Sequence, residues 1–402
     1  MTFAALPACS GAGVASTRAR GLTTPAPVVV PPVPSGSGAA LGLKWDWDRV
    51  DAYAPWLRGL PGGDTFYELV WCDVEPKPGQ PDWSRIDDVV DGAARVGFRT
   101  GLKIRVGSCW ATDQRLDARG KKQKTASLLP TDLDAYRQFV QAVVTRYAPR
   151  GVHAYAIENE VNGEGFWGSS PEDFDRLARV AAAEIRHSDP KAVVLDGGIS
   201  STAYGEAIAR WLLDQGRAPE AIDAYTRYYD RRFDVRGDQL PRVNDAAGLE
   251  AALKGDQATR NLTFLATSLR LAHDGVVDAW QLHFYERWDN VPLLLEYLRA
   301  HLPAGMPIES WETGLFWSGA PDDLAALATE TKNTVSLLLA GGVRTVIWLP
   351  AANNPGGKRA EEIRWGLFDP DGHPRPAADV FKQLALTAAG AAGTTPTTGR
   401  SG

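Results

Sequence analysis

Two apolar stretches of the chain end in glutamates, whose carboxyl groups can serve as general acids, general bases and nucleophiles. The first stretch reads HAYAIENE and ends in Glu158, Asn159 and Glu160. The second reads PIESWETG and carries Glu309 and Glu312. An apolar strand that ends in a carboxylate delivers it to one edge of a sheet. Whether the acids meet therefore depends on the elements that hold these stretches.

Eight apolar, strand-like runs alternate with helical patterns such as LDAYRQFVQAVVTRYA and PEDFDRLARVAAAEIRHSD. The runs lie at residues 41–47, 66–74, 99–107, 153–160, 192–199, 276–286, 307–314 and 343–350. This alternation predicts an α/β protein with the fold of a (β/α)8 TIM barrel. A doubly wound open sheet is the competing architecture, but no G-x-G-x-x-G motif follows an early strand.

The domain boundaries follow from composition. With 402 residues, 44% of them hydrophobic, the chain is long enough for one barrel-sized core. We predict the barrel over residues 41–390, with an insertion at 216–275 between strands five and six. Residues 1–40 are rich in Pro, Gly and Ser and are predicted to be a disordered linker, and residues 391–402 a disordered tail.

The three cysteines bear on the location of the protein. The segment TFAALPAC, which ends at Cys9, resembles the end of a bacterial lipoprotein signal and predicts a lipid-anchored, extracellular or cell-surface protein. The alternative is a disordered tail with an incidental cysteine on a cytoplasmic protein. Cys72 and Cys109 either pair or stay as buried thiols, of which buried thiols are the commoner outcome.

Charge and composition exclude several classes of partner. The net charge of −6 without a long basic block argues against binding to duplex nucleic acid. The six histidines show no zinc-ligand spacing, so we predict no metal and no cofactor. No apolar run is long enough to span a bilayer. The sequence carries no signal for an oligomeric state.

In a (β/α)8 barrel, the carboxyl ends of the strands meet in one cavity, which is where the active site lies. The residues at those ends are Trp45, Asp46, Trp47, Trp71, Asp73, Arg105, Asn159, Glu160, His283, Tyr285, Glu312 and Trp348. Two carboxylates, several hydrogen-bonding groups and a ring of aromatics would share this cavity. Aromatic faces stack on the C–H faces of pyranose rings, so the set favours a carbohydrate substrate.

These motifs resemble the clan A glycoside hydrolases, which are retaining glycosidases on TIM barrels. The resemblance lies in an Asn-Glu pair that ends strand four, here in AIENEVNG, and a second Glu that ends strand seven, here in IESWETGLFW. Residues 74–98, QLHFYERW, VIWLP and residues 365–384 resemble further segments of the clan. The resemblance covers residues 41–390 and does not select one family within the clan.

The resemblance implies a β-glycosidase that cleaves an oligo- or polysaccharide by double displacement. Glu312 is expected to be the nucleophile and Glu160 the acid/base, with their carboxyl groups about 5–5.5 Å apart. Asn159 is expected to bind the sugar 2-hydroxyl.

Five further residues are expected to bind the substrate or support the acids. Tyr285 would hydrogen-bond Glu312, and His283 would contact sugar or carboxylate. Trp348 would form the floor of the sugar subsite, and Trp45 is a further candidate. Many clan members carry an arginine on strand two that contacts the nucleophile. This chain has none there, and Arg105 on strand three is the candidate replacement.

Several alternatives stay open. Glu158 competes with Glu160, and Glu309 with Glu312, although strand alternation predicts that only one of the latter pair faces inward. His283, Tyr285 and the tryptophans are alternatively core residues.

Other functions are also open. The chain is alternatively a catalytically inactive glycan-binding barrel that is tethered through Cys9. A lyase or aldolase would need a Schiff-base lysine at a strand end, and the only candidate, Lys103, lies inside strand three.

Overall fold

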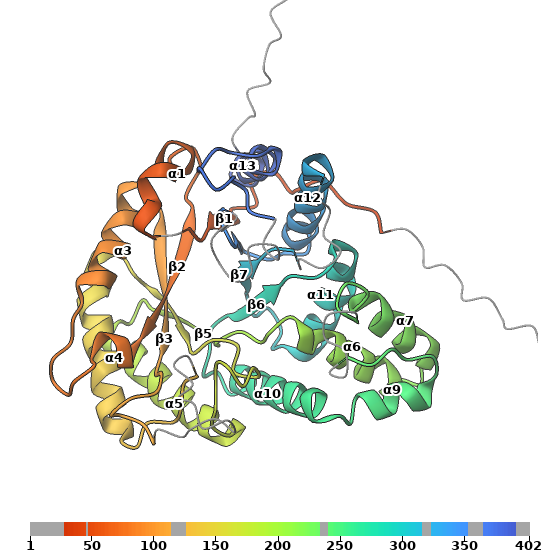
Figure 1. Cartoon of the computed structure of the whole chain (residues 1–402), viewed down its shortest axis with the longest axis horizontal. Coiled ribbons are helices and arrows are strands. Elements are labelled where there is room, and N and C mark those ends of the chain that lie inside the picture. The colour runs from red at the N-terminus through yellow and green to blue at the C-terminus, as the bar shows by residue number, and fades with distance from the viewer. Residues whose placement is uncertain are drawn as a thin grey trace, which may run out of the picture.

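The computed structural model describes residues 28–45, 47–113, 126–233, 240–315, 323–352 and 365–390. Within these ranges, eight parallel strands alternate with helices, which confirms the predicted α/β class (Figure 1). The strands are β1 (Ala40–Leu43), β2 (Asp64–Val70), β3 (Arg99–Arg105), β4 (Ala154–Ile157), β5 (Val193–Leu195), β6 (Trp280–Phe284), β7 (Ile308–Thr313) and β8 (Thr345–Trp348). Each overlaps a predicted run, but the last residues of most runs lie beyond the strand and form the rim of the barrel.

Strand pairing divides the barrel wall into two parallel sheets, ordered β1-β8-β7-β6 and β2-β3-β4-β5. β5 meets β6 through isolated bridges, one of them between Leu195 and Ala279. At the other seam, β1 approaches β2 so closely that a Cβ atom on Gly42 would lie 1.8 Å from the carbonyl oxygen of Asp64. The described residues form no hydrogen-bonded ladder across this second seam. The predicted (β/α)8 fold is therefore confirmed, with its wall open between β1 and β2.

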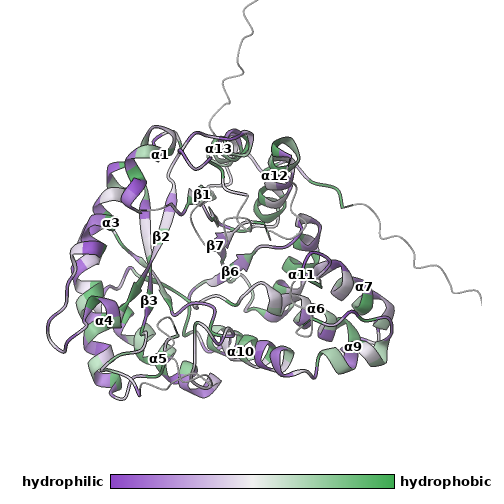
Figure 2. Ribbon diagram, in the orientation of Figure 1, coloured by the Kyte–Doolittle hydropathy of each residue, from purple (hydrophilic) through white to green (hydrophobic). Residues whose placement is uncertain are grey.

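The helices surround the strands in Figure 1. They are α1 (Val50–Leu57), α2 (Trp71–Val74), α3 (Ser84–Arg95), α4 (Leu133–Tyr147), α5 (Pro171–Ser188), α6 (Thr202–Asp214), α7 (Ala218–Tyr228), α9 (Ala246–Ala252), α10 (Asp256–His273), α11 (Val291–His301), α12 (Leu324–Ala340) and α13 (Pro376–Ala388). The barrel helices carry both hydrophilic and hydrophobic residues, as expected for helices that cover a core with one face (Figure 2). Helix α5 begins with a capping box in which Ser170 and Asp173 each bond the other's backbone N–H.

The segment 216–275 between β5 and β6 is mostly helical. It contains α7, α9 and α10, and α7 and α9 lie with α6 as a group at one side of the barrel (Figure 1). Helix α10 packs against α5 and α6. The insertion is therefore built onto the barrel through α6 and α10.

The described part of the amino-terminal segment is not a free linker. The backbone N–H groups of Gly36 and Gly38 donate to the carbonyl oxygens of Thr387 and Ala388 at the end of α13. These bonds tie residues before position 41 to the last helix of the barrel. Cys9 and the tail at 391–402 lie outside the described residues. No helix in the described ranges combines the length and the low polarity that crossing a bilayer requires.

Apolar side chains fill the amino end of the barrel interior. They are Phe66, Ala156, Leu195, Ala279, Trp311 and Ile347. Trp311 is the largest of them, and it fits because Gly101 leaves room for it. A Cβ atom on Gly101 would lie 2.4 Å from the Trp311 ring. This apolar plug lies between the polar groups of the carboxyl end and Asp64, Arg99 and Glu309 at the amino end.

Cys72 in α2 and Cys109 in the loop after β3 form a disulfide, so the alternative of two buried thiols is wrong. Both residues follow the carboxyl end of a strand. The bond therefore ties together the loops after β2 and β3 on the rim where the predicted site lies.

Replacing both Cys72 and Cys109 with alanine is expected to lower the free energy of unfolding. The bond joins positions 37 residues apart, and closing a loop of that length stabilises a protein by about 2–4 kcal/mol. Urea unfolding of the variant and of the wild type, each with and without reductant, measures the effect. Identical midpoints for the oxidised wild type and the variant would contradict the prediction.

Candidate active site

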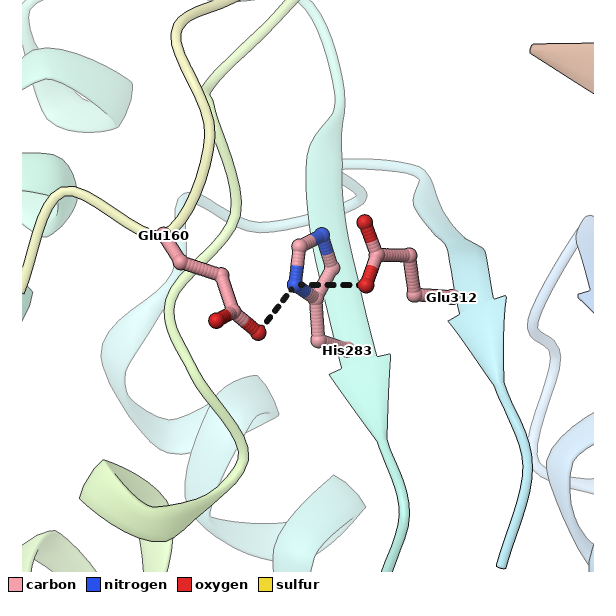
Figure 3. A group of neighbouring side chains, drawn as sticks. All are labelled: Glu160, His283 and Glu312. Carbon is pink, nitrogen blue, oxygen red and sulfur yellow. Dashed lines mark hydrogen bonds and ion pairs between the residues drawn. The ribbon is translucent and has the colours of Figure 1, made fainter. Parts of the chain in front are cut away.

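Glu160, His283 and Glu312 meet at the carboxyl end of the barrel (Figure 3). One carboxylate oxygen of each glutamate and one ring nitrogen of His283 all lie within 4.8 Å of one another. The imidazole lies between the two acids, with Nδ1 at 3.0 Å from Oε1 of Glu160 and 3.7 Å from Oε2 of Glu312. The three come from the end of β4, from β6 and from β7. The structure thus brings together the two glutamates that the sequence singled out.

The backbone just after β4 is strained. Glu158 has φ 68° and Glu160 has φ 41°, a left-handed region that non-glycine residues seldom adopt and that costs about 1–3 kcal/mol per residue. Two hydrogen bonds hold this conformation, from the N–H of Glu158 to Ile104 and from the N–H of Glu160 to Gly197. In a regular strand, Glu158 and Glu160 would point to the same side. The left-handed backbone instead turns their carboxylates in different directions.

Glu158 points into the protein and not into the site. It is fully buried, and Oε1 accepts a hydrogen bond of 2.7 Å from the backbone N–H of Val106. Burial raises the pKa of Glu158 to about 7, although the positive charge of Arg105 and hydrogen bonds from Ser127 and Val106 oppose the rise. Glu158 therefore links the ends of β4 and β3 through its bond to Val106. Of these two glutamates, only Glu160 lies at the site.

A bulge in β7 decides how Glu309 and Glu312 face. Glu309 pairs with Gln281 of β6 and Glu312 pairs with His283, so the two β7 residues between the glutamates oppose a single residue of β6. Because Gln281 and His283 share one face of β6, their partners share that face too. The prediction that only one of the two glutamates faces inward is therefore wrong. They point into opposite ends of the barrel, with Glu309 beside Asp64 and Arg99 at the amino end.

Lys103 is the cation that contacts Glu312. Its side chain is fully buried, and Nζ lies 2.6 Å from Oε1 of Glu312 and 2.6 Å from Oδ1 of Asn159. The Tyr285 hydroxyl donates to the other oxygen of Glu312, at 2.8 Å. Both carboxylate oxygens are thus held, which fixes the carboxylate plane.

The same contacts set the ionisation of Glu312. Burial raises the pKa of this carboxyl, but the positive charges of His283, Lys103 and Lys44 outweigh burial and hold its pKa well below the ordinary value. Glu312 is therefore ionised at neutral pH, which is the state in which a carboxylate can attack a carbon.

Arg105 does not take the expected role. Its guanidinium lies 2.9 Å from Oε2 of Glu68 and 3.8 Å from Glu158. Lys44 pairs with the other oxygen of Glu68, at 3.2 Å. Arg105 therefore neutralises two neighbouring acids, and the cation on Glu312 comes from Lys103, two residues earlier on the same face of β3.

His283 is oriented from behind by Gln281. Nε2 of His283 lies 2.8 Å from Oε1 of Gln281, whose Nε2 donates to the carbonyl oxygen of Asp196. Because that donation fixes the amide orientation, Gln281 presents an acceptor to His283 and favours a proton on its Nε2. Gly198 makes room for the ring, since a Cβ atom there would lie 2.4 Å from Nε2 of His283.

The tryptophans predicted to bind sugar lie elsewhere. Trp348 is fully buried, and its ring meets Phe381 of α13 edge-on, so it faces the helix layer and is not brought to the site. Trp45 is 3% exposed and packs edge-on against Phe98 in the core. Asp46 and the side chain of Trp47 lie outside the described part of the structure.

Trp365 lies close to Tyr285, the tyrosine that contacts Glu312. Its Nε1 donates to the carbonyl oxygen of Leu349, and a Cβ atom on Gly314 would lie 2.7 Å from that nitrogen and 3.1 Å from the Tyr285 ring. The sequence placed Trp365 in a segment resembling the clan, but no strand pattern marked it as a site residue. Lys103 was detectable from alternation, because it shares the inward face of β3 with Arg105.

The cluster of two glutamates and a histidine also has the composition of a metal site. The ammonium group of Lys103 argues against that use. It lies 2.6 Å from Glu312 and 3.3 Å from Nε2 of His283, so it already supplies positive charge where a metal ion would sit.

For a reaction that uses the ionised Glu312 carboxylate, Lys103→Met is expected to move the acid limb of kcat/KM upward by about one pH unit or more. The acid limb reports the ionisation of an essential group in the free enzyme. Removing this cation raises the pKa of Glu312. When the pH is lowered, Glu312 of the variant is therefore protonated, and activity is lost, at a higher pH than in the wild type. The matched control is Lys191→Met, at an exposed turn before β5. An unchanged acid limb in Lys103→Met would show that Lys103 has only a structural role.

No protein-family model matches this chain, and no curated protein matches it by sequence. Its fold is similar to that of solved glycoside hydrolases. A family 39 enzyme from Bacteroides cellulosilyticus WH2 is 14% identical, over 89% of this chain and 65% of that one, with a TM-score of 0.56. A GH5_18 enzyme from Streptomyces cattleya, solved with GlcNAc, is 14% identical over 88% and 80%, with a TM-score of 0.56. Xylanase 10B from Thermotoga petrophila, solved with xylobiose, is 13% identical over 88% and 95%, with a TM-score of 0.52.

These three structures are clan A glycoside hydrolases, the group that the sequence resembles. At this level of identity, the likeness shows the fold. This chain spans slightly less than two thirds of the length of the Bacteroides enzyme.

Proposed function

We propose that the protein is a retaining β-glycosidase that cleaves oligo- or polysaccharides with Glu312 as nucleophile and Glu160 as acid/base. The observation that carries this proposal is the approach of the two carboxylates to within 4.8 Å. Retaining glycosidases keep their carboxyl groups about 5–5.5 Å apart, whereas inverting enzymes need about 6.5–9.5 Å to admit a water molecule. The spacing here supports direct attack by a carboxylate.

In the first step, one oxygen of Glu312 attacks the anomeric carbon of the sugar, and the bond from that carbon to the leaving oxygen breaks. Glu160 gives its proton to the leaving oxygen. Lys103 and Tyr285 hold the Glu312 carboxylate in the attacking position. The products are a glycosyl-enzyme ester and a free alcohol.

In the second step, water attacks the anomeric carbon and gives its proton to Glu160, and the ester bond to Glu312 breaks. Two inversions at the anomeric carbon restore its configuration. Esterification removes the negative charge of Glu312 while Glu160 acts as the base. His283 contacts Glu160 directly and holds it in line.

Asn159 is the residue proposed to bind the sugar. Its Oδ1 faces the ammonium group of Lys103, which can only donate, so the amide NH2 group is left to face the substrate. This orientation suits donation to the 2-hydroxyl, a contact that strengthens in the transition state.

The test is hydrolysis of a panel of aryl β-glycosides, including xyloside, glucoside and mannoside, followed by proton NMR. We expect one sugar to be cleaved and the β-anomer to appear first, before mutarotation. Initial release of the α-anomer would overturn the retaining mechanism. Binding of glycans without cleavage of any aryl glycoside or polysaccharide would instead support the inactive glycan-binding barrel.

We also propose that the protein is exported and anchored through Cys9. The disulfide between Cys72 and Cys109 supports export, since such bonds persist in oxidising compartments and are rare in the cytosol. Mass analysis of the protein from its native host is expected to show cleavage before Cys9 and a lipid on its thiol. An intact amino terminus in the cytosolic fraction would contradict this.

A further inference from the structure

A cavity of about 420 Å³ opens at Glu160, and the mechanism above leaves it unused. One wall is the loop after β4, which includes Phe166. The opposite side is formed by Gln257 and Asn261 of α10, which belong to the insertion. The insertion therefore reaches the catalytic acid.

The position of this cavity relative to the two glutamates identifies its side. It is lined by Glu160, whereas Glu312 and the described residues that hold it, Lys103 and Tyr285, do not line it. The acid must lie next to the leaving oxygen, and the nucleophile must lie on the other side of the anomeric carbon. The cavity is therefore on the leaving-group side of the scissile bond.

The floor of the cavity is a chain of hydrogen bonds between buried side chains. The Asn162 amide donates to Asn261 at 2.7 Å, and the Asn261 amide donates to Glu206 at 2.8 Å. Gln257 donates to the same oxygen of Asn261 at 3.1 Å. Asn162, Asn261 and Glu206 are each at most 2% exposed. Such a network is rigid, so it presents its remaining polar atoms in fixed directions.

The lining suits an uncharged ligand with many hydroxyl groups. Burial raises the pKa of Glu206 to about 8, although the hydrogen bond from Asn261 opposes the rise, so the carboxyl is neutral at pH 7 and able to donate a proton. Phe166 adds an aromatic surface, with the Arg105 guanidinium 5.3 Å from the ring centroid. Convergent amide and hydroxyl groups beside one aromatic ring are what a pyranose ring binds well.

A second cavity of about 850 Å³ adjoins the first. The two share Glu164 and Gln257 in their linings. The second is bounded by α9 and the first turns of α10, including Gly248 and Arg260. Together they form a groove from the catalytic acid along the insertion, with room for more than one sugar ring.

We propose that the insertion forms the binding site for the leaving group, and that this group is an oligosaccharide chain of at least two sugar residues. This inference rests on the proposed function, because a leaving group exists only if glycosyl transfer occurs at Glu312. The substrate is then a saccharide chain that extends along α9 and α10 from the scissile bond, and not a glycoside with a small aryl or alkyl group.

A trapped glycosyl-enzyme tests the groove separately from the first chemical step. The traps are the 2-deoxy-2-fluoro-β-glycosyl fluorides of xylose, glucose and mannose, which esterify Glu312 with loss of fluoride. An acceptor sugar in the groove then attacks the anomeric carbon through a hydroxyl oxygen, its proton goes to Glu160, and the ester bond breaks. Xylose, xylobiose, glucose, cellobiose, mannose and mannobiose are compared as acceptors, with release followed by intact mass.

At least one disaccharide is expected to release the trapped enzyme about tenfold faster than its monosaccharide at equal concentration. Gln257→Leu and Phe166→Ala are each expected to remove most of that advantage. Thr259→Ala is the matched control, because Thr259 is exposed on the same turn of α10 and does not line either cavity. This control is expected to behave as the wild type.

The outcomes separate the two proposals. Absence of any glycosyl-enzyme would refute the proposed function, and the groove proposal with it. If the glycosyl-enzyme forms, two results would overturn the groove and leave the proposed function standing. One is equal release by monosaccharides and disaccharides. The other is an equal disaccharide advantage in Thr259→Ala and in both groove variants.

Discussion

Glu312→Ala is expected to lower kcat/KM for glycoside hydrolysis by at least about 10⁴-fold, the scale seen when a covalent nucleophile is removed. The alanine cannot form the glycosyl-enzyme, and the pathway through it is closed. Azide is expected to restore cleavage of an activated aryl glycoside, because the anion fits the space of the lost carboxylate beside Lys103. Attack from that side inverts the anomeric carbon, so the product is the α-glycosyl azide, which NMR identifies.

The matched control for this variant is Glu309→Ala. Glu309 lies on the same strand but at the amino end of the barrel, where its carboxylate accepts from the Trp311 ring nitrogen. We expect its kcat/KM to stay within about threefold of the wild type, as for substitutions away from the chemistry. Because Glu312→Ala also leaves Lys103 buried without its carboxylate partner, Glu312→Gln is measured beside it to separate loss of charge from loss of packing. Azide rescue in the Glu309 variant, and none in the Glu312 variant, would reverse the assignment.

Glu160→Ala is expected to lose activity according to the leaving group. General acid catalysis contributes about 10²–10⁴-fold, and it matters most when the departing oxygen is basic. An oligosaccharide substrate should therefore lose about 10³-fold or more in kcat/KM, whereas a 2,4-dinitrophenyl glycoside should lose far less. Azide is again expected to accelerate turnover, but here it replaces water at the glycosyl-enzyme, so the product is the β-glycosyl azide.

Glu158→Gln distinguishes the two acids that end β4. Glu158 accepts from the Val106 backbone and points away from the site, so its amide variant should keep the leaving-group dependence of the wild type. The plot of log kcat/KM against leaving-group pKa is the readout. A steep plot for Glu158→Gln, together with a flat one for Glu160→Ala, would move the acid/base role to Glu158.

Much of this site was predictable from the residues that end the apolar runs of the sequence. In a parallel barrel every strand runs the same way, so residues that end apolar runs share one rim whatever the details of packing. That geometry is why Asn159, Glu160, His283, Tyr285 and Glu312 were identified from their order in the chain.

Features that depend on a departure from regular geometry were not predictable in this way. The β7 bulge adds one residue between Glu309 and Glu312, and alternation alone then predicts the wrong relation between their faces. The left-handed backbone at Glu158 and Glu160 is held by bonds to Ile104 of β3 and to Gly197, which follows β5.

Contacts between side chains far apart in the chain were equally unpredictable from the sequence. The sequence offered Arg105 as the cation for Glu312, but both Arg105 and Lys103 face inward, and which acid each meets depends on how far along the barrel axis each side chain reaches. The same holds for Trp348 and Trp365. The strand pattern favoured the former, whereas the structure turns it toward Phe381 and places Trp365 beside Tyr285.

The sequence by itself determined the order and direction of the elements, and hence which residues gather on the rim, because hydrophobic periodicity is a local property of the chain. Only the tertiary structure decided which of those residues touch. Lys103 on Glu312, the Cys72–Cys109 bond and the cavity that Gln257 lines together with Glu160 each join segments far apart in the chain. Such contacts are set by packing and burial in three dimensions, which no periodicity along the chain encodes.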